Sequence, residues 1–148
     1  MSWTGVAAAL ACAAGLGGAV QIAVQGRLSE RVGSLEALAT ASVVGGLIAL
    51  AVLLVSRRSL AGVGDALAGP KWLLLGGVMS ALIILAITIA GPKIGIVATT
   101  AFLIAGQFAL ATAIDRNGWF GVERIGVTWW RVVGLLFLVA GAALTLRR

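Results

Sequence analysis

The sequence predicts an all-α integral membrane protein, a single transmembrane domain of five helices over residues 1–148. Composition is the first reason, because 61% of the residues are hydrophobic, only 11% are charged, and the mean hydropathy is +1.11. A soluble domain carries about 25% charged residues. The second reason is that the charges gather in short clusters between uncharged runs of about twenty residues, the length that a helix needs to cross roughly 30 Å of hydrocarbon.

Five runs meet or nearly meet this length. In chain order, we expect helices over about residues 3–25, 35–55, 72–90, 94–114 and 128–146. The first run has no basic residue before it and is too long for the apolar core of a signal peptide, so it is predicted to be a helix. The fifth is the least sharply bounded, and we expect it to begin near Thr128 and to hold Arg131 at the headgroup level by snorkelling. All five tryptophans fall at or beyond predicted span ends, where an indole ring prefers the interface.

Glycine and proline mark the connections between these helices. The turn sequences are Gly33-Ser34, Gly69-Pro70, Gly91-Pro92-Lys93 and Asn117-Gly118. Because the Gly-Pro-Lys link is very short, the third and fourth helices are predicted to form an antiparallel hairpin. Ser34 is expected to cap the second helix, with Glu36 in its first turn, where a carboxylate suits the helix dipole. Asp115 ends the fourth helix against the dipole, so it should pair with Arg116 or Arg131.

The residue inventory argues against catalysis. The chain has no histidine and one cysteine, so it lacks a zinc tetrad, a Cys/His pair and a Ser/His/Asp triad. We therefore expect no enzyme activity, no cofactor and no metal site. The net charge of +6 arises mostly from basic residues that flank the spans, which indicates anionic lipid headgroups rather than nucleic acid as the partner.

With an odd number of spans, the two termini lie on opposite sides of the membrane, and the basic residues of the loops on the two sides can be compared. One side of the membrane would receive Arg57, Arg58, Lys71, Arg116, Arg124 and Arg131, and the other Arg27, Arg31, Lys93, Arg147 and Arg148. Six against five is a weak bias under the positive-inside rule, so the chain is predicted to insert in both orientations. Two opposed copies could then pair as an antiparallel homodimer of ten helices, which gives alternating access by symmetry. The alternative is that the first helix fixes one orientation.

Uncharged polar residues inside the spans are the candidate substrate-binding groups: Gln21, Gln25, Ser42, Thr100 and Gln107. Gln21 and Gln25 lie one turn apart, and Thr100 and Gln107 lie two turns apart, so each pair shares a helix face. Amides are costly in lipid unless they are paired, and they should point into the bundle or a wet cavity. For Gln107 a simple interhelical hydrogen bond is an equal alternative, and for Gln25 a solvated helix end. Threonine more commonly bonds back to its own helix.

The middle of every span lacks Asp, Glu, Lys, Arg and His. Such residues carry protons or neutralise charged substrates within membranes, so no proton carrier is evident. A cavity lined by amides and hydroxyls suits a neutral or weakly charged solute, whose desolvation its hydrogen bonds would offset.

The order of these motifs resembles the YdcZ-type family (formerly DUF606), a five-helix branch of the drug/metabolite transporter superfamily in bacterial inner membranes. The resemblance rests on Gln21, Gln25, Gly33-Ser34, Ser42 with Gly45, Gly91-Pro92-Lys93-Ile94-Gly95, Ala105-Gly106-Gln107 and Asp115 before Asn117-Gly118. The resemblance implies a transporter or exporter from a family whose members occur as antiparallel pairs, as dual-topology single genes or as fused ten-helix proteins. Gln25, Leu35 and Val43 depart from the family pattern of Asn, Pro and Phe.

The small multidrug-resistance relatives use a glutamate in the middle of helix one, where this chain has Cys12, Ala13 and Ala14. Their proton-coupled export of cations therefore does not carry over. The function expected from the sequence is alternating-access transport of a small solute. Two alternatives remain, a passive channel and a membrane scaffold that transports nothing, for which faces of small residues would suffice.

Overall fold

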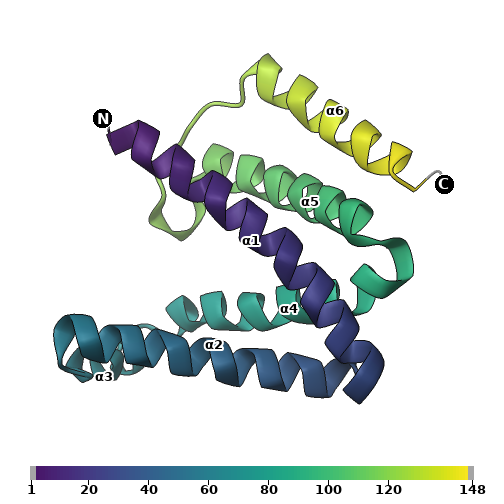
Figure 1. Cartoon of the computed structure of the whole chain (residues 1–148). Coiled ribbons are helices and arrows are strands. Elements are labelled where there is room, and N and C mark those ends of the chain that lie inside the picture. The colour runs from purple at the N-terminus through teal and green to yellow at the C-terminus, as the bar shows by residue number, and fades with distance from the viewer. Residues whose placement is uncertain (1–2, 147–148) are drawn as a thin grey trace. The chain divides into compact units, whose positions relative to one another are not determined.

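The computed structural model describes residues 3–146, and it is all-helical over them, with no strand in that range. The elements are α1 (Trp3–Val32), α2 (Ser34–Arg57), α3 (Ala61–Ala68), the 3-10 turn η1 (Lys71–Leu74), α4 (Leu75–Ile94), α5 (Ile96–Asn117), the 3-10 turn η2 (Trp119–Gly121) and α6 (Trp129–Leu144) (Figure 1). The prediction of an all-α protein is confirmed. Arg147 and Arg148, which enter the predicted charge balance, lie outside the described residues.

The chain divides into two compact units, and α1 contributes to both. The first unit contains residues 3–21 and 94–146, which are the N-terminal part of α1 together with α5, η2 and α6. The second unit contains residues 22–93, which are the C-terminal part of α1 with α2, α3, η1 and nearly all of α4.

In the first unit, α5 and α6 lie side by side and run in opposite directions (Figure 1). Gly118 ends α5 in the left-handed conformation (φ 65°, ψ 34°), and its N–H donates to the carbonyl of Ile114. The Ile125 N–H donates to the carbonyl of Asp115 at 2.9 Å, which folds the connection back onto the end of α5. Arg131 at the start of α6 pairs with Asp115 at 2.9 Å, one of the two partners expected for that carboxylate.

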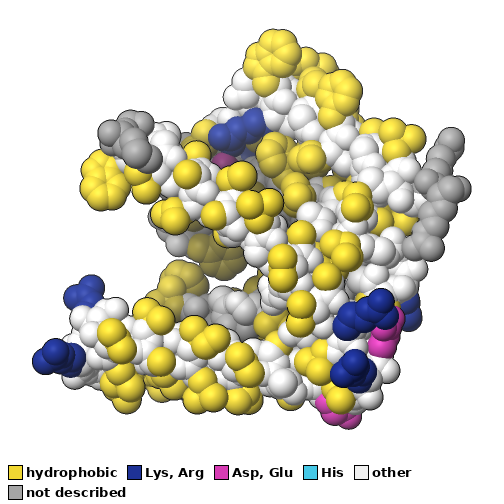
Figure 2. All heavy atoms as spheres, in the orientation of Figure 1, with side chains coloured by type: hydrophobic (Ala, Val, Ile, Leu, Met, Phe, Trp, Pro, Cys, Tyr) yellow, Lys and Arg dark blue, Asp and Glu magenta, His cyan; other side chains and the backbone are white. Residues whose placement is uncertain are grey.

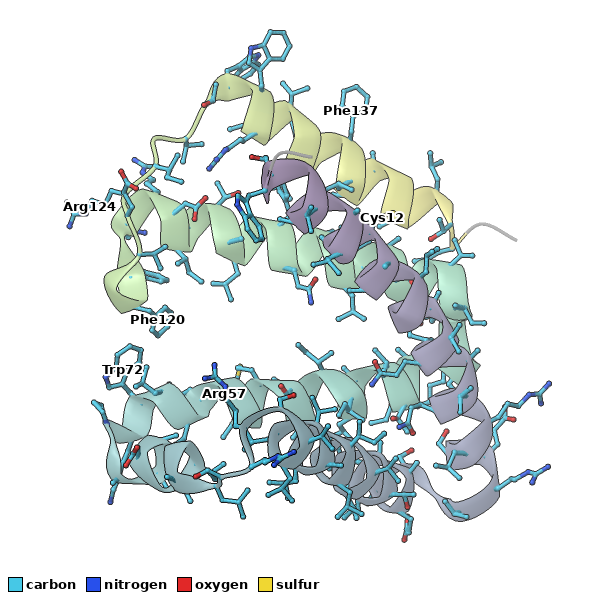
Figure 3. All side chains as sticks on the ribbon, turned by 60° about the vertical axis from the view of Figure 1, so that its left-hand side comes forward. Cys12, Arg57, Trp72, Phe120, Arg124 and Phe137 are labelled. Atoms are coloured by element: carbon cyan, nitrogen blue, oxygen red, sulfur yellow. The ribbon has the colours of Figure 1, made fainter. Side chains whose placement is uncertain are left out.

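In the second unit, α2 and α4 are joined by α3, which is not predicted from the sequence, and by η1, most of which falls within the predicted third helix. Arg57 ends α2 and Trp72 lies in η1, so a charge and an indole ring flank this connection (Figure 3). Such residues are typical of the headgroup region, which agrees with the predicted ends of the second and third spans.

Within residues 3–146, four helical stretches are long and apolar enough to cross a membrane: Trp3–Val32, Ser34–Arg57, Lys71–Ile94 and Ile96–Asn117. The fifth helix, α6, has 16 residues and is apolar but shorter. At 1.5 Å per residue it extends about 24 Å, less than the roughly 30 Å of a hydrocarbon core. Large apolar side chains are exposed along these helices, and Figure 2 shows them spread over the visible face with charges gathered at helix ends. This distribution is the one that lipid favours.

Two helix breaks differ from those expected. The Gly91-Pro92-Lys93 sequence lies inside α4 rather than between two helices, and the chain breaks at Gly95 instead (φ 85°, ψ 163°). The α1–α2 break is likewise a single residue, Gly33 (φ 101°), so Ser34 is the first residue of α2 and not its cap. In both places a positive φ that favours glycine turns the chain within one residue. The first helix therefore runs to Val32, seven residues beyond its predicted end.

Candidate functional site

In the second unit, α1 and α4 pack closely where they cross. A Cβ on Gly26 would lie 3.3 Å from the ring of Pro92, and one on Gly91 would lie 3.0 Å from Ile22 Cγ2 and 3.3 Å from the Ile22 carbonyl oxygen. Each helix thus presents a glycine to the other, and Ile22, Gly26, Ile87 and Gly91 are all buried. Small residues are what allow helix backbones to approach closely in a membrane.

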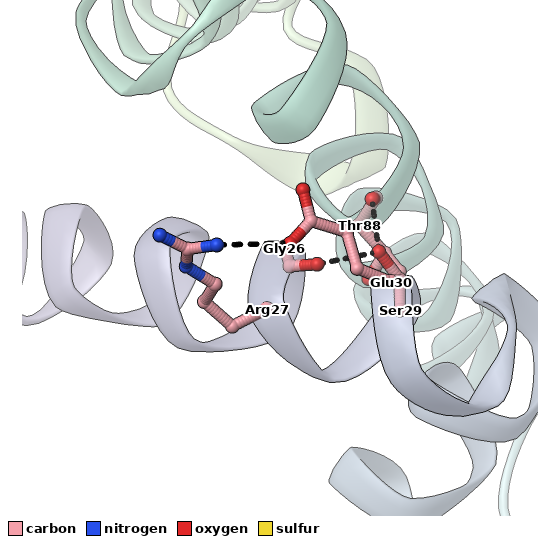
Figure 4. A network of polar contacts seen from close by, with 5 residues as sticks. All are labelled: Gly26, Arg27, Ser29, Glu30 and Thr88. Carbon is pink, nitrogen blue, oxygen red and sulfur yellow. Dashed lines mark hydrogen bonds and ion pairs between the residues drawn. The ribbon is translucent and has the colours of Figure 1, made fainter.

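Pro92 leaves one backbone carbonyl at this crossing without its usual hydrogen-bond donor. Proline has no N–H, so in the last turn of α4 it cannot bond to the carbonyl of Thr88, four residues earlier. The Ser29 hydroxyl of α1 lies 3.2 Å from that carbonyl and 2.8 Å from the carbonyl of Gly26, and it shares its proton between them (Figure 4). Ser29 therefore supplies from another helix the bond that Pro92 removes.

Gln25, one turn before Ser29, is the group that this crossing leaves unsatisfied. The side chain is 7% exposed, and its Oε1 is buried without a hydrogen-bond partner in the described structure. Gln25 also lies seven residues inside α1, not at the solvated helix end that was the alternative reading. Leaving a buried acceptor unpaired costs about 1–3 kcal/mol, so this oxygen is suited to a donor from outside the unit, such as a solute, a second copy or water.

A cavity of about 340 Å³ adjoins the same crossing. It is lined by Ser29, Glu30, Ser34, Thr88, Ile89, Pro92 and Lys93. Thr88 is fully buried and its own hydroxyl donates to the carbonyl of Ile84. Glu30 forms an exposed ion pair with Arg27, one turn earlier on α1, at 3.2 Å (Figure 4). The cavity thus combines hydroxyls with one charge of each sign.

The first unit has a different kind of cavity. It measures about 460 Å³ and is lined by α1, α5 and α6, with Ala19, Thr100, Ala101, Phe137, Gly141 and Ala142 among its residues. Thr100 is the predicted site residue that lines it. Its hydroxyl donates to the carbonyl of Ile96 in its own helix at 2.9 Å, the behaviour most common for threonine in a helix.

The other predicted residues lie elsewhere. Gln21 and Gln107 belong to the first unit, do not line its 460 Å³ cavity, and are exposed in the described chain. Ser42 belongs to the second unit and is exposed on α2. None of the cavities described within residues 3–146 is lined by two of the five candidates.

Two residues of the crossing, Ser29 and Thr88, are absent from the sequence-based candidates. Ser29 was placed outside the first helix, because the predicted helix ends at residue 25. The signal that could have found Thr88 is its position four residues before Pro92, which marks its carbonyl as unbonded. Within residues 3–146, no group of three or more Cys, Asp or Glu side chains comes together to hold a metal.

Comparison with known families decides the identity. The family described as "Putative inner membrane exporter, YdcZ" matches residues 6–144. The chain belongs to this family. It is accordingly a multi-pass protein of the bacterial inner membrane, as its long apolar helices also indicate. No curated protein and no solved structure matches the chain.

Proposed function

We propose that this YdcZ-family chain exports a small, neutral or weakly charged solute by alternating access, as an antiparallel homodimer. Membership of an exporter family supports movement of a solute out of the cell. The observation that carries the solute class is the unpaired Oε1 of Gln25, buried at a close helix crossing. An amide oxygen accepts a hydrogen bond from an N–H or O–H without requiring a charge.

The packing around Gln25 favours solutes that carry a hydrogen-bond donor over solutes that carry none. Gly26 and Gly91 allow the two backbones to approach closely. The Ser29 hydroxyl already donates to the Thr88 carbonyl, which Pro92 leaves without its helical donor. The Oε1 of Gln25 is the buried side-chain acceptor that no described group satisfies, so a solute whose N–H or O–H donates to it would offset the cost of burying both groups. A solute without a donor leaves the acceptor unpaired and is disfavoured.

The homodimer is supported by the position of Gln107. This residue lies near the middle of α5, which runs from Ile96 to Asn117, and its amide is exposed in the single chain. An amide facing hydrocarbon at that depth is costly, and a second copy can hydrogen-bond it. The six-to-five division of basic residues lets the second copy insert with the opposite orientation.

Transport in everted inner-membrane vesicles tests this function. Vesicles containing the full chain are exposed to tritiated uncharged solutes that carry N–H or O–H donors, such as urea derivatives, sugars and aliphatic alcohols. We expect at least one to show saturable uptake with counterflow exchange, at least tenfold reduced in Gln25→Ala. Val24→Ala, an exposed neighbour on α1, is the matched control and should retain uptake.

The alternatives give different results. Uptake without saturation or counterflow would indicate a channel. No uptake above that of empty vesicles would favour a scaffold. Normal uptake in Gln25→Ala, with a normal dimer on gel filtration, would show that the Gln25 amide does not bind the solute.

A further inference from the structure

The 460 Å³ cavity of the first unit takes no part in the function proposed above. We propose that it is a second binding site, one for an uncharged, apolar small molecule. Its walls come from the N-terminal part of α1, from α5 and from α6, all within one compact unit.

The chemistry of the lining selects the ligand. Among the residues that the structure describes, no charged side chain lines the cavity, and Thr100 is the one polar residue of the lining. The Thr100 hydroxyl gives its proton to the Ile96 carbonyl, so the cavity offers a ligand no free donor. A cation or anion would lose its hydration here without compensation, whereas an apolar surface gains about 25 cal/mol for each Å² it buries.

The size and walls of the cavity also fit a ligand. Ligand sites in proteins measure about 300–1,000 Å³, a range that includes the volume of this cavity. Ala142 is 1% exposed, so helix packing closes the cavity on that side, while a Cβ placed on Gly141 would meet no atom within 4 Å. The empty space of the cavity therefore lies over Gly141, and a larger side chain at this position can fill it.

The opening favours a molecule that arrives through the bilayer. Val97 and Phe137 line the cavity and are 70% and 75% exposed, and Figure 3 shows Phe137 standing out from α6. In a membrane-spanning chain that surface meets lipid, so an uncharged apolar molecule dissolved in the acyl chains can reach the cavity without crossing water.

Binding of N-phenyl-1-naphthylamine, an uncharged fluorophore that brightens in apolar surroundings, tests the site. The full chain is reconstituted in lipid nanodiscs, and the signal of empty nanodiscs is subtracted. We expect saturable binding with one site per chain, at least tenfold weaker in Gly141→Leu, which fills the cavity. Gly134→Leu on the same helix, where a Cβ also meets no atom and no cavity residue is changed, should bind normally.

A second variant, Ala101→Leu on α5, also fills the cavity and should weaken binding in the same way. It keeps the test valid if Gly141→Leu fails to fold. Binding that never saturates, or is equal in the filled and control variants, would overturn the proposal and indicate that only bilayer acyl chains occupy the groove. Displacement of the fluorophore by the permanent cation tetraphenylphosphonium, as effective as displacement by naphthalene, would overturn the charge selectivity. None of these results depends on Gln25.

Discussion

At the residue scale, one proline determines the polar chemistry of the α1–α4 crossing. Pro92 leaves the Thr88 carbonyl without its helical donor, and Ser29 replaces that donor at 3.2 Å. The bond matters because lipid offers an unpaired carbonyl no water. Neighbouring glycines keep the helices close enough for the hydroxyl to reach.

Ser29→Ala should lower the free energy of unfolding of the full chain in micelles by about 1 kcal/mol, because it leaves the carbonyl unpaired. Pro92→Ala restores an N–H that can bond to Thr88, so the loss caused by Ser29→Ala should shrink in that background. Denaturant titration of the double-mutant cycle measures the coupling. Strictly additive effects would mean that Ser29 does not replace the proline's missing donor.

Gly91→Ala should destabilise the same crossing by about 1–3 kcal/mol, since its Cβ would come 3.0 Å from Ile22 Cγ2 and 3.3 Å from a backbone oxygen. Gly77→Ala, on the same helix with no atom within 4 Å of the added Cβ, should be neutral or slightly stabilising. Thermal unfolding of the two variants in parallel measures the difference. Equal effects would place the close contact in doubt.

At the element scale, single glycines set the ends of the helices. Gly95 has φ 85° and ψ 163° between α4 and α5, a conformation that is essentially restricted to glycine and costs another residue about 1–3 kcal/mol. Gly33 plays the same part between α1 and α2 with φ 101°. The Gly-Pro pair that looks like a turn in the sequence is instead helical, because proline is compatible with helical φ and only its lost donor must be replaced.

Gly95→Ala should therefore lower the unfolding free energy by about 1–3 kcal/mol. Gly106→Ala, inside α5 with open space around its Cβ, should raise it by roughly 0.5–1 kcal/mol through reduced freedom of the unfolded chain. Denaturant titration of both variants provides the comparison. A Gly95→Ala chain as stable as the wild type would show that the break does not require a positive φ.

The sequence predicts the helical class and the approximate spans because hydrophobic run length is a strong signal. It predicts the Asp115 pair because a carboxylate at the C-terminal end of a helix needs a cation, which Arg131 provides. It does not predict Ser29 or the burial of Gln25, which depend on how far α1 extends. That extension has no apolar signal, since residues 26–32 include Arg27, Glu30 and Arg31.

At the scale of the whole molecule, the orientation of the chain depends on α6. If α6 crosses the membrane, the basic residues divide six to five, and both orientations should form. If the 16 residues of α6 do not cross the membrane, Arg147 and Arg148 lie on the same side as the group of six basic residues. The division of basic residues is then eight to three, which fixes one orientation. The antiparallel homodimer therefore requires that α6 span the bilayer, and Arg131 paired with Asp115 sets where that span begins.

Labelling in intact spheroplasts with a membrane-impermeant maleimide tests the dimer most directly. Cys12 is replaced by Ser, and a single cysteine is placed at Ser59 in the α2–α3 connection or after residue 148. The antiparallel account predicts that each site is labelled in about half of the molecules, with full labelling after permeabilisation. Labelling of either site in all molecules or in none would contradict it.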